Sequence, residues 1–180
     1  MQLTPTPILG AFIAEQKAFG DHRGYFARAY CKDVFAGAGL DYEFVQANMS
    51  GNAKAGTLRG LHYQDETAPE AKFLRCVRGA IYDVIVDLRP SSPSFRQWFG
   101  VELTQNNKTA ILVPPMCAHG YLSLTDDTEV FYQVSNTYTP SAERGMRFDD
   151  PSIVIDWPVD IVEVSDKDKN WPDLTTQGIV

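Results

Sequence analysis

Runs of β-branched and aromatic residues dominate the middle of the chain, from residue 42 to about residue 136. Clusters of Gly, Pro, Asn, Asp and Ser separate these runs and favour turns between them. Short strands that recur every 8–12 residues or so, about the spacing seen here, are typical of β-sandwiches and barrels rather than of alternating β–α units. We predict strands at Tyr42–Asn48, Thr57–Tyr63, Phe73–Val77, Ile81–Leu88, Gln97–Leu103, Thr109–Val113, Tyr121–Leu124 and Glu129–Ser135.

The flanking regions add a hairpin and little helix. Phe12–Lys17 and Tyr25–Tyr30 lie on either side of a glycine-containing turn, which predicts a hairpin or an edge pair of strands. Helix is expected only at Lys32–Ala38 and in a short turn at Asp166–Lys169. Because the sequence contains no internal repeat, low-complexity tract or linker, we predict one compact β-domain over residues 1–180.

Alternation along the strands predicts which side chains point into the barrel, because successive residues of a strand face opposite sides. Asp83 shares a face with Ile81 and Ile85, so a carboxylate is interleaved with apolar residues. Tyr132 shares a face with Val130 and is expected to point into a largely apolar interior, where its hydroxyl needs a partner.

Arg59 and His62 would lie on opposite faces of a regular strand. A bulge at Gly60 would bring them to the same face, since a glycine inside a strand often marks such an irregularity. We therefore expect a distortion at this position.

The composition narrows the function. A net charge of −7 and a pI of about 4.9 argue against nucleic acid or an anionic membrane as the main partner. A local group of arginines and lysines can still bind an anionic small molecule, because exposed charges farther apart than about 8 Å are largely screened at physiological salt. Three widely spaced cysteines favour reduced core thiols over a nucleophile or a zinc site. With no signal-peptide pattern and no long apolar run, we expect a cytoplasmic protein.

Four side chains suggest proton transfer. His62 can act as a general base at neutral pH, Arg59 and Lys72 supply positive charge, and Tyr132 supplies a phenol. Together they suit deprotonation next to a carbonyl on an anionic substrate, which needs no metal and no redox cofactor. The alternative is a hydrogen-bonded structural histidine with solvated cations beside it.

Two further segments can be interpreted in two ways. His119 follows Pro114 and Pro115, and proline, a short spacer and histidine are similar to the second motif of metal-binding cupin barrels. The first motif offers only His62, which is too few ligands to predict a transition metal. The charged segment Asp166–Lys169 is either an exposed turn or a wall that brings a carboxylate to His62 and a lysine to the substrate.

Short motifs are spread from about residue 8 to residue 173. They are Phe19–Gly24 (FGDHRG), Gly56–Gln64 (GTLRGLHYQ), Asp83–Arg89 (DVIVDLR), Ser92–Phe95 (SPSF), Ala118–Tyr121 (AHGY), Asp150–Pro151, Ile155–Pro158 (IDWP) and Ser165–Asp168 (SDKD). Their order and spacing resemble the dTDP-4-dehydrorhamnose 3,5-epimerase family. The resemblance implies a cupin-like jelly-roll β-barrel with a few short helices, without metal or cofactor, that works as a homodimer.

The same resemblance implies a substrate and roles for individual residues. The substrate would be a nucleotide-diphosphate 4-keto-6-deoxy sugar, inverted at C3, C5 or both through an enolate. His62 would be the base paired with Asp168, Lys72 would stabilise the enolate, and Tyr132 would return a proton from the opposite face of the ring. The positions that would hold the nucleotide and sugar are Arg23, Gln46, Asn48, Arg59, His119, Glu143 and Lys167.

Two positions depart from the family pattern. Arg28 stands where a glutamate is usual, and Ala47 stands where a polar residue is usual. A guanidinium in place of a carboxylate reverses the local charge and removes hydrogen-bond acceptors. The nucleobase therefore stays open. Two alternatives also stay open: a barrel that moves the keto group between C3 and C4, and a non-catalytic or metal-binding cupin sensor.

Overall fold

The computed structural model describes residues 1–179, and strands dominate it. The strands are β1 (Gln2–Pro5), β2 (Phe12–Glu15), β3 (Ala18–Asp21), β4 (Gly24–Ala27), β5 (Gln46–Asn52), β6 (Thr57–Gln64), β7 (Lys72–Arg78), β8 (Ala80–Asp87), β9 (Trp98–Thr104), β10 (Thr109–Val113), β11 (Cys117–Ser123), β12 (Thr128–Val134), β13 (Glu143–Gly145) and β14 (Glu163–Val164). The helices are α1 (Lys32–Gly37), α2 (Asp166–Lys169) and the 3-10 turn η1 (Pro140–Ala142). The single-domain prediction includes residue 180, which lies outside the described residues, and stays a prediction.

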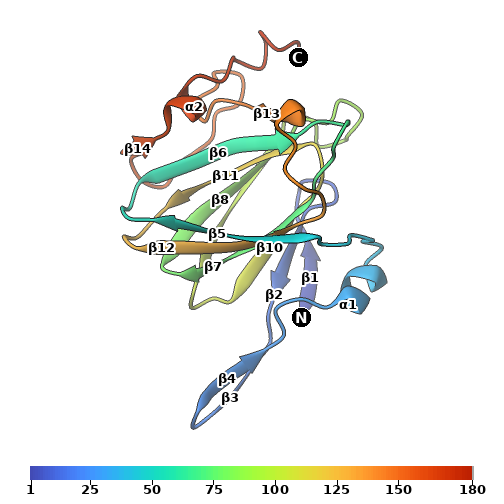
Figure 1. The fold of residues 1–180 in the computed structure, drawn as a ribbon, viewed down its shortest axis with the longest axis vertical. Coiled ribbons are helices and arrows are strands. Elements are labelled where there is room, and N and C mark those ends of the chain that lie inside the picture. Colours follow the sequence, from blue (N-terminus) through green and yellow to red (C-terminus); the bar gives the residue numbers. More distant parts are fainter. Residues whose placement is uncertain (180) are drawn as a thin grey trace.

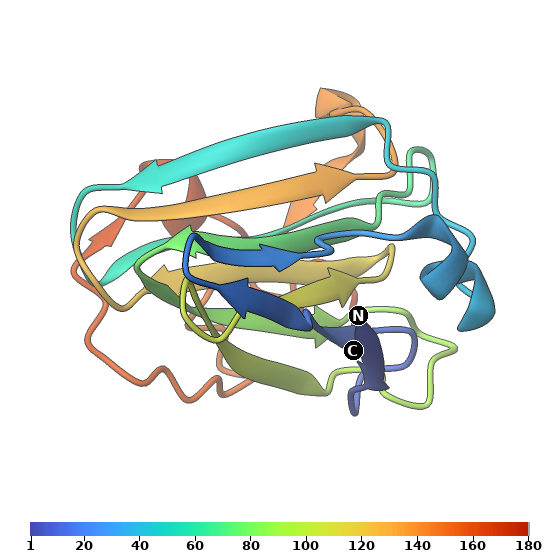
Figure 2. The same cartoon turned by 90° about the horizontal axis from the view of Figure 1, so that it is seen from below.

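Two large antiparallel sheets form the barrel (Figure 1). One has the strand order β1-β2-β10-β7-β12-β5, and the other β13-β6-β11-β8-β9, with β14 added in parallel to β6. Figure 2 shows the strands running lengthwise, with α1 at one end. Sequence neighbours such as β11 and β12 lie in different sheets, so the chain repeatedly crosses between them.

The main core lies between the two sheets. Leu74 and Ile111 come from one sheet, Ile81 and Ile85 from the other, and all four are almost completely buried. Tyr132 packs against this cluster from β12. The faces predicted from alternation are therefore confirmed for β8 and β12.

A second cluster covers the outer face of the sheet that contains β7. The rings of Tyr30, Phe35, Phe44 and Phe73 lie within 5.0–6.2 Å of one another, so α1 and the segment after it pack on β7. This packing corrects one predicted strand: Tyr42–Asn48 is not a strand over its whole length. Its aromatic residues join this cluster, and β5 begins only at Gln46, where pairing with β12 starts.

Another predicted strand is longer than expected. The prediction began at Tyr121, but β11 begins at Cys117. The small residues around His119 have weak strand propensity. Pairing with β8 along the whole of β11, and with β6 along part of it, nevertheless makes this segment a fully buried central strand.

The predicted hairpin forms with a different first strand. β3 pairs with β4 around the glycine turn, whereas β2 pairs with β1 and β10. The run Phe12–Lys17 therefore belongs to the barrel and not to the hairpin. The β3–β4 hairpin projects away from the barrel (Figure 1) and exposes Phe19, Tyr25 and Phe26 by 60–68%.

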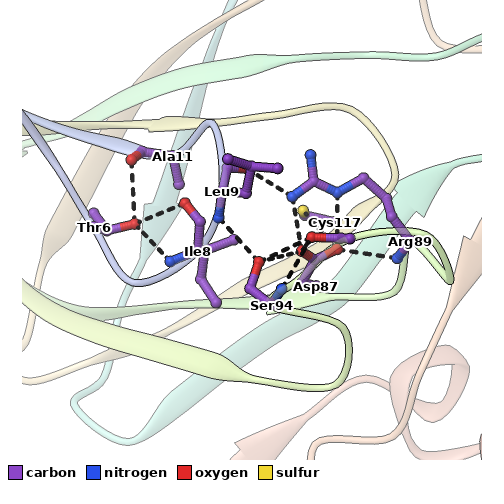
Figure 3. Close-up of polar contacts among 9 residues, drawn as sticks. Thr6, Ile8, Leu9, Ala11, Asp87, Arg89, Ser94 and Cys117 are labelled. Atoms are coloured by element: carbon purple, nitrogen blue, oxygen red, sulfur yellow. Dashed lines mark hydrogen bonds and ion pairs between the residues drawn. The ribbon is translucent and has the colours of Figure 1, made fainter.

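A buried carboxylate ties the N-terminal loop to the end of β8 (Figure 3). The Asp87 side chain is completely buried and accepts hydrogen bonds from the Arg89 guanidinium and from the hydroxyls of Ser92 and Ser94. Arg89 also donates to the Leu9 carbonyl, and the Leu9 amide donates to Ser94. These bonds join the N-terminal loop at Leu9 to the segment from Asp87 to Ser94, which is at least 78 residues further along the chain.

Two composition-based predictions can be compared with the structure. Cys76 and Cys117 are buried free thiols, and burial raises the pKa of Cys76 to about 11 and that of Cys117 to about 12. Both fit the expected reduced core thiols, while Cys31 is only partly buried. No helix in residues 1–179 combines the length and apolar character needed to cross a bilayer.

Candidate active site

A cavity of about 470 Å³ opens between the sheets. This size is in the range typical of small-molecule sites. The predicted site residues that line it are Arg59, His62, Lys72, His119, Tyr132, Lys167 and Asp168. A second cavity of about 310 Å³ shares His62, Lys72 and Tyr132 with the first and is also lined by Gln46, Asn48 and Glu143. The two cavities are therefore neighbouring parts of one region.

His62 and Asp168 form a close pair at the wall of this cavity. His62 Nε2 lies 2.6 Å from Asp168 Oδ1, and the Gly60 amide donates to the other carboxylate oxygen at 3.3 Å. The Ser165 hydroxyl caps α2 by accepting from the Asp168 amide, which holds the carboxylate toward β6. Burial alone would raise the pKa of Asp168, but the bonds from His62 and Gly60 outweigh it and the pKa is lowered.

A bulge at Gly60 brings Arg59 and His62 to the same cavity, as predicted. In the pairing of β6 with β11 the register shifts, so that His62 lies opposite His119 while Arg59 lies opposite Tyr121. Gly60 has a φ of +121°, and a Cβ on it would lie 2.5 Å from the Gly120 Cα. Only glycine permits this backbone conformation and this close approach of two strands.

Tyr132 approaches the cavity from the other sheet. It lies on β12 opposite Asn48 of β5, whereas His62 lies on β6. Burial is the main cause that raises the pKa of Tyr132, with smaller contributions from Tyr121 and Glu70, so the phenol stays protonated at neutral pH. The cavity therefore has an imidazole on one wall and a protonated phenol on the facing wall.

The cations of the site are held by specific partners. Lys72 Nζ lies 2.6 Å from Glu70 Oε2, and both side chains are at most 15% exposed. Arg59 donates to the Asn52 side chain at 2.7 Å and to the Gly51 carbonyl at 2.9 Å. Glu70 was not among the predicted site residues. Its position two residues before Lys72 was the available signal, because residues i and i+2 of an extended segment share a face.

A second histidine–carboxylate pair lies deeper in the barrel. His119 Nε2 is 2.9 Å from Asp83 Oδ2, and Asp83 is completely buried. The other Asp83 oxygen is buried without a hydrogen-bond partner within residues 1–179. The alternation of residues along the strand predicted that Asp83 faces the barrel interior, but it could not identify His119 as the partner of Asp83.

Four predicted residues that line the cavities also bond to neighbouring side chains: Lys167, Glu143, Gln46 and Asn48. Lys167 Nζ lies 2.5 Å from Glu143 Oε1, and the Tyr138 hydroxyl donates to Glu143 Oε2 at 2.8 Å. Burial opposes ionisation of Glu143, but these two bonds outweigh it, so its pKa is lowered. Gln46 donates to Asn48 at 2.8 Å on β5.

Arg23 is the one predicted site residue that does not line either cavity. It lies on the β3–β4 hairpin, its side chain is 78% exposed, and its guanidinium pairs with Asp21. Among residues 1–179, no three His, Cys, Asp or Glu side chains are grouped so that they could hold a metal ion.

The fold and the site define a class of protein: a cupin-like β-barrel in which a histidine–aspartate pair and a tyrosine lie across one cavity. Sequence comparison leads to the same class. The family model for dTDP-4-dehydrorhamnose 3,5-epimerase matches residues 5–176. The chain belongs to this family, as the motifs predicted, and its relatives are named as epimerases, which are isomerases.

Individual relatives resemble the chain over almost its whole length. A dTDP-4-dehydrorhamnose 3,5-epimerase from Shigella flexneri is 45% identical over 171 residues, which is 94% of each chain. One from Methanothermobacter thermautotrophicus is 41% identical over 94% of this chain and 92% of its own. The solved Bacillus anthracis epimerase, with TDP and pyrophosphate bound, superposes with a TM-score of 0.93 at 41% identity, over 96% of this chain and 99% of its own. The predicted all-β, cupin-like fold class is thereby confirmed.

Proposed function

We propose that this protein epimerises a dTDP-linked 4-keto-6-deoxy sugar at C3, C5 or both, through an enolate. The observation that carries the proposal is the placement of the His62–Asp168 pair and of Tyr132 on facing sheets around one cavity. Inversion requires a base on one face of the sugar ring and a proton donor on the other. A single base that returned its own proton would restore the original configuration.

The proposed reaction begins at His62. The ring nitrogen that is not bonded to Asp168 takes the proton from the carbon next to the ketone, and the C–H electrons move into the carbonyl to form the enolate. Asp168 stabilises the resulting imidazolium. Tyr132 then donates its proton to the opposite face of the same carbon, and exchange with solvent resets both groups.

Positive charge near the carbonyl oxygen lowers the barrier. Lys72 lines the cavity beside Tyr132 and is held by Glu70. Loss of one preorganised group that stabilises a developing oxyanion typically costs about 3–4 kcal/mol of transition-state stabilisation. We assign this role to Lys72, and we assign contacts with the nucleotide and sugar to Arg59, His119 and Lys167.

The thymidine nucleotide is proposed from the relatives. The Bacillus anthracis structure contains TDP, and an epimerase from Legionella pneumophila, 36% identical, was solved with dTDP-4-keto-L-rhamnose. Because Arg28 and Ala47 depart from the family pattern, nucleotides with other bases should be tested as well. A thermal-shift series with dTDP, UDP, GDP and CDP measures the preference, because a ligand that binds only the folded state raises stability by RT ln(1 + [L]/Kd).

We also propose that the protein is a homodimer and acts in the cytoplasm. Arg23 is too exposed to serve the cavities of its own chain, and it lies on a hairpin that presents Phe19, Tyr25 and Phe26. Packing of this hairpin on a second copy would cover the aromatic rings and bring Arg23 toward that copy's site. Light scattering after size-exclusion chromatography measures the mass, and a monomer with full activity would contradict the proposal.

The direct test of the reaction is deuterium incorporation from D₂O into a dTDP-4-keto-6-deoxy sugar, with NMR of the product. We expect deuterium at the inverted carbon in the wild type and none with His62→Ala. A carbonyl at a new carbon would instead indicate the ketoisomerase, and binding without exchange would indicate a sensor. Neither alternative is favoured, because the relatives are named as epimerases.

A further inference from the structure

Trp171 packs against His62, the candidate base. It follows α2 in the chain, and its indole meets the His62 ring edge-on, with 6.1 Å between the ring centroids and 61° between the planes. Aromatic pairs prefer this edge-to-face arrangement. Among residues 1–179, Asp168 is the one side chain hydrogen-bonded to the His62 ring, and it binds one ring nitrogen. Together the two neighbours define the orientation of the imidazole.

The indole occupies the place of a missing side chain. Gly145 is the cross-strand partner of His62 in the β13–β6 pair. A Cβ on Gly145 would lie 2.3–2.6 Å from three atoms of the Trp171 ring, which are the nearest atoms it would meet. Gly145 does not have a positive φ, so its lack of a side chain here serves the indole and not the backbone.

Trp171 also contacts the helix that carries Asp168. Lys167 Nζ lies 5.9 Å from the centroid of the indole ring, a cation–π distance, while it pairs with Glu143 of β13. The indole thus contacts α2, β13 and the His62 ring of β6. Its Nε1 is buried without a hydrogen-bond partner within the described residues, so the ring acts through its shape and not through its N–H group.

We propose that Trp171, seated over Gly145, is a positioning residue that holds the His62 ring against Asp168 for proton transfer. This inference rests on the proposed function, in which His62 is the base. Without the indole, the imidazole gains room to rotate away from Asp168 and water gains access to the pair. Proton transfer would then slow while substrate binding stays nearly unchanged.

A double-mutant cycle between Trp171 and Gly145 tests the proposal. Trp171→Ala and Gly145→Ala are each expected to lower kcat by roughly 10- to 100-fold with little change in KM, as expected for a misplaced catalytic group. Because the added methyl group of Gly145→Ala meets mainly the indole, the double variant is expected to be no worse than Trp171→Ala alone. Trp171→Phe, which keeps an aromatic ring in place, is expected to retain most of the activity.

Two results would overturn the proposal. One is wild-type kcat in Trp171→Ala, and the other is a Gly145→Ala loss that is equally large without the indole. A Trp171→Phe variant as slow as Trp171→Ala would also contradict the argument from shape. Trp157→Ala is the matched control, because Trp157 is also a partly buried tryptophan, but it packs edge-on against Tyr82, and neither residue lines the cavity.

NMR of the histidine ring nitrogens separates this inference from the proposed function. Trp171→Ala and Gly145→Ala are expected to shift the ring-nitrogen signals of the His62 imidazole, and Trp157→Ala is expected to leave them unchanged. This readout needs no substrate. If the wild type failed to exchange deuterium, the proposed reaction would be wrong, while unchanged His62 signals in both variants would refute the positioning role by themselves.

Discussion

Replacement of Asp87 by Asn should cost the protein a large part of its stability. The carboxylate is completely buried and accepts six hydrogen bonds: from the Arg89 amide, the Arg89 guanidinium (two bonds, both 2.8 Å), the hydroxyls of Ser92 and Ser94, and the Cys117 thiol at 3.8 Å. Burial alone would raise the pKa of Asp87, but these bonds outweigh it and hold the pKa at about 2, against the ordinary value of 3.8.

The magnitude follows from this lowered pKa. At about 1.36 kcal/mol per pKa unit, the difference between 3.8 and about 2 is worth about 2.5 kcal/mol of stability at neutral pH. The Asn variant also leaves the largely buried Arg89 without its charged partner, and breaking a buried pair costs about 3–5 kcal/mol. We therefore expect the free energy of unfolding in urea to fall by about 3–4 kcal/mol at pH 7.

Asp149→Asn is the matched control. Asp149 also accepts two bonds of 2.8 Å from an arginine two residues away, but its side chain is 47% exposed. Exposed pairs of this kind are worth about 0–1 kcal/mol. Because the folded-state pKa of Asp87 is lowered, its contribution is complete above the unfolded pKa near 4 and disappears as the pH falls toward 2. Equal losses in the two variants, or a loss for Asp87→Asn that does not shrink between pH 6 and pH 2.5, would refute this reasoning.

The remaining predictions concern the site. Gly60→Ala should lower both the melting temperature and kcat, because the methyl group would lie 2.5 Å from the Gly120 backbone at a φ of +121°. Gly51→Ala is the control and should change neither quantity, because the space around Gly51 is open. Equal melting temperatures of the two variants by circular dichroism would contradict the bulge argument. Tyr132→Phe should still exchange deuterium at the carbon that His62 deprotonates but should lose inversion, which NMR of the recovered sugar measures; full inversion would remove Tyr132 as the acid.

The sequence pattern predicted those strands that the core covers, because burial of a strand requires apolar residues on its covered face. β6 to β10 and β12 carry alternating or continuous apolar runs, because each is covered on at least one face by the core. β13 and β14 have three and two residues. They pair with β6 because the long chain segment after β12 passes beside that strand in the folded protein. Strands this short carry no periodicity of their own, so the sequence could not predict them.

The site shows the same division between local and tertiary information. Residue types and motifs were enough to select His62, Lys72 and Tyr132, because their chemistry is visible in the sequence. The partners of these residues were harder to predict, since Trp171 reaches His62 from more than a hundred positions away. Gly145 is the clearest example of a packing partner that the sequence could not predict. A glycine in a strand suggests only a bulge or a close approach, and the structure is needed to show that Trp171 fills the space beside it. The sequence is thus enough to select a candidate residue by its chemistry, while the packing that orients the side chain becomes known only from the fold.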